Sequence, residues 1–243
     1  MIASLSMYER PELKFYQNKY WHEIRKSLRK KNLPAPKKLT SEGLGLEFWK
    51  KPDLILSQTC GLPFRKYLYK KVKLVGTPDY KIKGCPPGYY FSCFVVRKTD
   101  NRKNLFDYND SMFAFNEKGS QSGYFAPLRH VNDQGFSFKK FHETGSHKNS
   151  VKSVIDGLAD IASIDIVTLD YMNKFDVFTK NLKVLEKTIP TPGLPYITSN
   201  NFNRELVFDA ICEALNNLSI EVKEILKIKQ IVKITKEEYL SIK

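Results

Sequence analysis

The segment Met112-Phe-Ala-Phe-Asn-Glu-Lys-Gly-Ser-Gln-Ser-Gly-Tyr124 runs from an apolar strand through a polar turn into a helix. A helix start presents free backbone N–H groups at the positive end of the helix dipole. Glycine lets a ligand approach the backbone closely, and serine hydroxyls add further donors. The sequence therefore predicts an oxyanion-binding turn made of Ser120, Gln121, Ser122 and Gly123. The alternative is an ordinary helix cap that holds no ligand.

A second turn of the same kind is Glu143-Thr-Gly-Ser-His147, which follows the apolar stretch 136–141. The helix predicted after it has an apolar stripe that contains Val151, Val154 and Leu158. His147 can donate a hydrogen bond to an anion, and does so more strongly when it is protonated. The alternative is a histidine that only caps or packs at the start of this helix.

Polar residues also follow the other predicted strands. Tyr8 follows the strand candidate 2–6, Gln58 and Thr59 follow the buried strand at 54–56, and Asp165 follows 161–164. Ligands of open α/β sheets bind beside the carboxyl ends of the strands, so we expect these side chains to contribute to one site. Gln58 and Thr59 supply neutral hydrogen bonds, and Asp165 accepts from an amine or hydroxyl of the ligand. The alternative for Asp165 is the N-cap of the next helix.

Strands and helices alternate along the chain, which predicts an α/β protein with mostly parallel strands. Two breaks rich in proline and glycine, near 84–88 and 188–195, are the best places for the chain to cross between lobes. The sequence thus predicts a discontinuous first lobe, 1–84 plus 190–243, and a continuous second lobe, 85–189. The lysine-rich tail is expected to be partly helical.

The net charge of +14 has three interpretations: a solvated basic surface, weak steering of a small anion, or nucleic-acid binding. The basic residues are scattered and no zinc-finger or RNA-binding motif occurs, so we expect no nucleic-acid partner. None of the four cysteines lies in a C-x-x-C pair, which argues against a zinc or redox motif. Spacing alone leaves open a disulfide between Cys85 and Cys93. The sequence predicts no metal site, no cofactor and a monomer.

No apolar run approaches the length of a membrane span, and the first residues do not form a secretory signal. Taken as written, the sequence predicts a cytoplasmic protein; a leader removed beforehand would make it periplasmic. Cys60 or a serine of the turns, together with His147 and Asp165, would be the parts of a catalytic triad. However, no G-x-S-x-G, G-x-G-x-x-G, H-E-x-x-H or P-loop motif is present, so we expect no catalysis.

Over nearly its whole length, the sequence resembles the phosphonate and phosphate substrate-binding proteins of ABC transporters, the PhnD-like family. The most specific parts of the resemblance are Ser-x-Ser-Gly, Gly-Ser-His and Ile-Asp. The segments that carry it, in chain order, are Asp53–Gly61, Tyr90–Ser92, Ser120–Tyr124, Thr144–His147, Asp156–Asp165 and Pro192–Pro195.

The resemblance implies a type II periplasmic-binding-protein fold, with a mixed, mostly parallel sheet in each of two lobes and a ligand cleft between them. It assigns Ser120, Gln121, Ser122 and His147 to the phosphonate oxygens and Asp165 to an amino group of the ligand. Tyr90 or Phe91 matches an aromatic before a strand of the second lobe, and Ser92 lies in the same matching segment. Gln121 replaces a small hydroxyl residue. The implied function is capture of a small oxyanion for an ABC permease; the alternative is an enzyme acting on a phosphorylated or carboxylated substrate.

Overall fold

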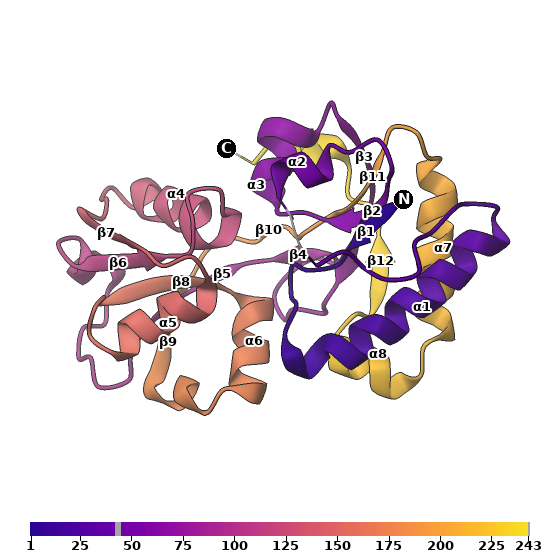
Figure 1. Cartoon of the computed structure of the whole chain (residues 1–243). Helices are drawn as coiled ribbons and strands as arrows, with labels where there is room; N and C mark the ends of the chain where they lie inside the picture. The colour runs from indigo at the N-terminus through magenta and orange to yellow at the C-terminus, as the bar shows by residue number, and fades with distance from the viewer. Residues whose placement is uncertain (42–44, 243) are drawn as a thin grey trace. The chain divides into compact units, whose positions relative to one another are not determined.

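The computed structural model describes residues 1–41 and 45–242, which form two compact units (Figure 1). The first unit consists of Met1–Tyr89 and Pro192–Lys243, and the second consists of Tyr90–Thr191. The chain leaves the first unit through β4 (Tyr89–Tyr90) and returns through β10 (Thr191–Pro192), and these two short strands pair with each other. Each unit has its own sheet and its own core.

The first unit contains a five-stranded sheet in the order β1-β2-β11-β3-β12. Its strands are β1 (Ile2–Ser4), β2 (Leu54–Gln58), β3 (Val72–Asp79), β11 (Tyr196–Ser199) and β12 (Gln230–Val232). Its helices are η1 (Pro11–Leu13), α1 (Lys14–Lys30), α2 (Leu46–Trp49), α3 (Gly61–Pro63), η2 (Phe64–Leu68), α7 (Arg204–Asn217), α8 (Ile220–Leu226) and α9 (Lys236–Leu240).

Helices cover both faces of this sheet because neighbouring strand residues point to opposite sides. On one face, Tyr196 packs in a core that α1 supplies with Ile24 and α7 supplies with Ile211. On the other face, Ile197 packs in a second cluster with Phe64 of η2 and Tyr239 of α9. The helix α1 forms because its buried residues recur at helical spacing.

The second unit contains a five-stranded sheet in the order β7-β6-β8-β5-β9. Its strands are β5 (Ser92–Arg97), β6 (Met112–Phe115), β7 (Lys140–Glu143), β8 (Ile161–Asp165) and β9 (Leu182–Lys187). Its helices are η3 (Leu105–Tyr108), η4 (Gln121–Phe125), α4 (Ala126–Asp133), α5 (His147–Ile155), α6 (Ile166–Phe175) and η5 (Val177–Asn181). Aromatic side chains dominate one core cluster, where the rings of Phe113 and Phe138 stack with centroids 4.5 Å apart.

The α/β class and the mixed sheets agree with the sequence prediction, but the expected majority of parallel strands is wrong. Among the described strands, β1–β2, β6–β7 and β6–β8 pair in parallel. The pairs β2–β11, β3–β11, β3–β12, β5–β8 and β5–β9 are antiparallel. A parallel pair needs a long crossover, usually a helix, between its strands. Strands β5 and β11 instead enter their sheets directly from the crossing segments, and they run antiparallel to their neighbours.

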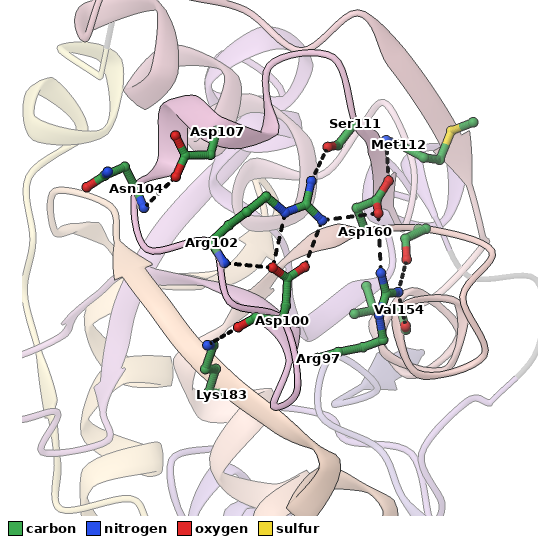
Figure 2. Close-up of polar contacts among 11 residues, drawn as sticks. Arg97, Asp100, Arg102, Asn104, Asp107, Ser111, Met112, Val154, Asp160 and Lys183 are labelled. Atoms are coloured by element: carbon green, nitrogen blue, oxygen red, sulfur yellow. Dashed lines mark hydrogen bonds and ion pairs between the residues drawn. The ribbon is translucent and has the colours of Figure 1, made fainter.

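An ion-pair cluster closes one end of the second unit's sheet (Figure 2). The guanidinium of Arg102 binds both carboxylate oxygens of Asp100, at 3.1 and 2.7 Å, and lies 3.3 Å from Asp160. Asp160 in turn accepts a 3.0 Å hydrogen bond from the backbone N–H of Met112, the first residue of β6. Charged groups that are also hydrogen-bonded in this way hold the start of β6 beside the residue that precedes β8.

Arg97 extends the cluster to the end of α5. Its Nη1 donates to the carbonyls of Val154 and Ala159, both at 2.7 Å, and its Nη2 lies 3.3 Å from Asp160. These carbonyls lie at the end of α5 and just before β8, where backbone acceptors lack partners within the helix. The cluster therefore fixes where α5 ends and where β8 begins.

We expect Arg102→Gln to lower the free energy of unfolding at pH 7 by about 2 kcal/mol, because it leaves Asp100 without its cation. The Arg102 guanidinium lowers the pKa of Asp100 to about 2. A carboxyl whose pKa is depressed in the folded state stabilises the fold above its unfolded pKa, so this contribution is lost as pH falls from about 4 towards 2. Urea unfolding at several pH values measures it.

The matched control is Lys139→Gln, which removes the exposed ion pair between Lys139 and Asp110 in the same unit. We expect that change to cost less than about 0.5 kcal/mol at every pH. Equal effects of the two substitutions, or an Arg102→Gln effect that does not shrink in acid, would contradict the assignment.

Candidate functional site

The turn after β6 is held in shape by its own serine. The hydroxyl of Ser120 accepts a 3.0 Å hydrogen bond from the backbone N–H of Gly123, so Ser120 is the N-cap of the turn, as the alternative interpretation required. The turn itself, Gln121–Phe125, is a π-helical turn that leads into α4. Ser120, Gln121 and Ser122 are all buried. The predicted polar residues are thus gathered in one wide turn that follows β6, an inner strand of the sheet.

A side chain of the neighbouring strand β8 forms a hydrogen bond with this turn. The hydroxyl of Ser163, a fully buried residue, donates a 2.8 Å hydrogen bond to the carbonyl of Ser122. The sequence interpretation did not single out Ser163. A hydroxyl residue in the middle of the apolar run Ile161–Ile164 was the available signal, because a buried polar group needs a partner.

The second predicted turn comes directly against the first. The hydroxyl of Ser122 lies 3.1 Å from Nε2 of His147, the first residue of α5. Ser146 caps α5 by accepting from the N–H of Asn149, and the hydroxyl of Thr144 donates to the carbonyl of Phe115 at the end of β6. The tertiary structure therefore joins the two turns through one hydrogen bond between side chains.

The environment of His147 favours the neutral imidazole. Burial lowers the pKa of His147, while the negative charge of Asp165 and a backbone contact with Ser163 act in the opposite direction. A neutral imidazole carries a single N–H, so the hydrogen bond with Ser122 has one donor and one acceptor whose identities depend on the tautomer. An anion next to this pair would favour the charged imidazolium.

Gly123 is the one position of the turn where no side chain fits. A Cβ added there would overlap Oδ1 of Asn116 and would lie 3.1 Å from Cε1 of His147. Asn116 follows β6 directly, and its Oδ1 is buried without a hydrogen-bond partner among residues 1–41 and 45–242. The sequence interpretation did not include Asn116, although an amide at the end of a strand beside a glycine turn was a usable signal.

Asp165 is the N-cap of α6, as the alternative interpretation expected. Its Oδ1 accepts from the backbone N–H groups of Val167 and Thr168 at 2.7 and 3.0 Å, and its Oδ2 accepts from the Thr168 hydroxyl at 2.6 Å. Ser92 lies opposite Asp165 in the β5–β8 pair, and its backbone N–H donates to the hydroxyl of Thr188. The carboxylate is therefore fixed at the edge of the sheet that also carries the two turns. Tyr90 is buried just before β5.

The remaining predicted residues belong to the first unit. The ring of Tyr8 packs edge-on against Tyr80, with centroids 5.3 Å apart. The amide Nε2 of Gln58 donates to the carbonyl of Leu194 at 3.0 Å, and the Thr59 hydroxyl donates to the carbonyl of Cys60 at 3.3 Å. Gln58 is the last residue of β2, and its hydrogen bond to Leu194 holds the chain segment that returns from the second unit.

The described residues give little support for a nucleophilic cysteine or a metal-binding site. The four cysteines, all in the described part of the chain, carry thiols and form no disulfide, and burial raises the pKa of the Cys93 thiol to about 12. A nucleophilic cysteine needs the thiolate, which this environment disfavours. In the described part of the chain, no group of three or more His, Cys, Asp or Glu side chains is arranged to hold a metal ion.

Two α/β units, each with its own mixed five-stranded sheet, define the class of substrate-binding proteins with the type II periplasmic-binding-protein fold. The chain belongs to the family of periplasmic substrate-binding proteins of phosphonate ABC transporters, whose model matches residues 70–239. This is a family of binding proteins and not of enzymes, so the enzymatic alternative is not supported. No curated protein matches the sequence.

Solved structures agree with this fold. PhnD1 of Prochlorococcus marinus, in complex with methylphosphonate, has 18% identity and a TM-score of 0.76, with 98% of this chain and 93% of that chain covered. A binding protein of an ABC phosphonate transporter from Pseudomonas aeruginosa has 15% identity and a TM-score of 0.73, with 100% and 83% covered. A Xanthomonas citri protein bound to ATP has 12% identity and a TM-score of 0.71, with 98% and 92% covered.

In the residues that the structure describes, no helix has the length and apolar character needed to cross a membrane.

We expect Gly123→Ala to destabilise the second unit by about 1–3 kcal/mol, because the added methyl group overlaps Asn116. Gly119→Ala is the matched control in the same loop, since a Cβ there meets nothing within 4 Å. We expect that control to change stability by less than about 0.5 kcal/mol. Thermal unfolding of both variants measures the difference, and equal melting temperatures would contradict the packing described for Gly123.

Proposed function

We propose that this ABC-transporter binding protein captures a small oxyanion, a phosphonate, phosphate ester or phosphate, at the turn Ser120–Gly123 with His147. The observation that carries the proposal is the 3.1 Å pair between Ser122 and His147. It places a hydroxyl and an imidazole together at a buried turn beside the start of α5. Hydroxyl, imidazole and helix-start N–H groups are the donors that phosphate-type oxygens accept from.

The protonation state of His147 is expected to change when the ligand binds. In the free protein, burial holds the pKa of His147 below its ordinary value, so the imidazole is neutral near pH 7. A bound oxyanion stabilises the protonated form and raises that pKa. Both ring nitrogens then carry hydrogen, and Ser122 is free to turn its own hydroxyl towards the ligand.

The remaining candidates are assigned to the rest of the ligand. Asp165, held rigidly by α6, is proposed to accept from an amino group, because its Oδ2 accepts only from the Thr168 hydroxyl and keeps a further lone pair, whereas Oδ1 already accepts two hydrogen bonds. In the second unit, Tyr90 and Ser92 are proposed to contact the organic part of the ligand. In the first unit, Tyr8, Gln58 and Thr59 are proposed to contribute to the same recognition. Gln121 adds an amide at a position where the family resemblance expects a small hydroxyl residue.

The proposal includes the predicted division of the chain into two lobes. The lobes 1–84 plus 190–243 and 85–189 are proposed to act as the two parts that move when ligand binds. Binding proteins of this architecture close by hinge motion at a few residues of the connecting segments. Here those segments are β4 and β10.

We expect Ser122→Ala to weaken binding of methylphosphonate by about ten- to a hundredfold, because the protein loses one hydroxyl that donates a hydrogen bond to the charged ligand. Isothermal titration calorimetry against methylphosphonate, inorganic phosphate, sulfate and acetate measures both affinity and selectivity. Ser137→Ala, an exposed serine of the same unit, is the matched control and should leave affinity unchanged. Equal affinity of wild type and Ser122→Ala for every oxyanion tested would remove the turn from the binding site.

We expect methylphosphonate affinity to rise as pH falls from about 8 to 6, by up to about tenfold per pH unit, because binding takes up a proton on His147. The sign follows from a pKa that is low in the free protein and raised in the complex. The His147→Gln variant should lose this part of the pH dependence, whereas protonation of the ligand itself affects both proteins equally. Identical pH profiles of the two proteins would show that His147 does not bind the anion.

A further inference from the structure

The first unit contains a polar pocket of about 500 Å³, which is formed by α1, the end of β1 and the segment 37–41. One face of α1 lines it, with Lys14, Gln17, Asn18, Trp21, His22 and Arg25. These residues recur at spacings of three and four, so they lie side by side on the helix. The segment 37–41 is fixed beside β1, because the N–H of Thr40 donates to the carbonyl of Ala3 at 2.7 Å. Figure 1 shows α1 in indigo at the start of the chain.

Two of the polar residues that line this pocket are almost completely buried. Ser4 is 1% exposed and Trp21 is 3% exposed. Within residues 1–41 and 45–242, Oγ of Ser4, Nε1 of Trp21 and Nε of Arg25 are buried without a hydrogen bond. The indole and guanidinium nitrogens can only donate. These three atoms are closed to solvent, so the donors that a ligand in the pocket could reach are those of the lysine and arginine side chains, and such cationic donors suit acceptor oxygens.

The charges of the pocket point to the same ligand. Four cationic side chains line it, those of Lys14, Arg25, Lys37 and Lys38, against the single carboxylate of Glu9. No ion pair is found for any of these five side chains within the described residues. Unpaired cations that surround a concave, polar surface raise the local concentration of anions. A volume of this size accommodates a whole small molecule and not only a single ion.

We propose that this pocket is a second binding site, specific for a multivalent oxyanion such as a diphosphate or a phosphorylated small molecule. Arg25 is placed to bind the anion with its planar guanidinium, which matches phosphate oxygens in pairs. Lys37 and Lys38, which belong to the segment 37–41, neutralise its remaining charge. The site is made entirely of first-unit residues and shares none with the turn Ser120–Gly123.

Tryptophan fluorescence tests the proposal directly, because the chain has two tryptophans and Trp49→Phe leaves Trp21 as the reporter. The probe is inorganic pyrophosphate, titrated into the Trp49→Phe, Ser122→Ala protein so that the turn of the second unit is weakened. We expect a saturable change in Trp21 emission. Sodium chloride at the same ionic strength should give no saturable change.

Arg25→Gln should weaken pyrophosphate binding at least about tenfold, because it removes a charged bidentate donor. Lys26→Gln is the matched control: it removes the same charge from the next residue of α1, which does not line the pocket. If Trp49→Phe fails to fold, calorimetry on Ser122→Ala with and without Arg25→Gln gives the same comparison. No saturable binding, an equal response to chloride, or equal effects of Arg25→Gln and Lys26→Gln would overturn the proposal.

Discussion

The parallel pairing of β6 with both β7 and β8 is the constraint on which the candidate site depends. Parallel strands end at the same edge of a sheet, so the residues that follow Phe115, Glu143 and Asp165 are brought together there. The antiparallel strand β5 begins at that edge and places Ser92 opposite Asp165. The hydrogen bond between Ser122 and His147 is a consequence of this arrangement, since the two residues belong to separate turns.

The two ends of this sheet have different chemistry for a physical reason. At the end where β6 and β8 begin, Asp160 is paired with Arg97 and Arg102, and the charges neutralise one another. At the end where the turns lie, Ser122, His147 and Asp165 carry donors and acceptors next to buried backbone. A closed ion-pair cluster stabilises a fold but offers nothing to a ligand. At the other end, the half-buried His147 at the start of α5 and the hydroxyl of Ser122 are the donors that we propose bind a ligand.

Much of the chain was predictable because its local signals agree with its fold. The strands at 54–56, 112–115 and 161–164 and the helix after His147 follow from apolar periodicity, and Ser120 and Asp165 follow from capping preferences. The supporting residues were harder to find. Ser163 matters only because the turn after β6, 41 residues away in the sequence, lies against it. Asn116 matters because the same turn brings Gly123 against its side chain. The strand β12 was not predicted within the lysine-rich tail, because it forms by pairing with β3, which lies far away in the sequence.

By itself, the sequence determined the α/β class, the family resemblance and the two turns, because each of these depends on residues close together along the chain. Only the tertiary structure decided strand direction and which side chains meet. Strands that enter a sheet from the crossing segments have no helix to set a parallel direction, so β5 and β11 run against the expected pattern. The Ser122–His147 pair and the donor-lined pocket beside α1 arise from packing between distant segments, which no local pattern specifies.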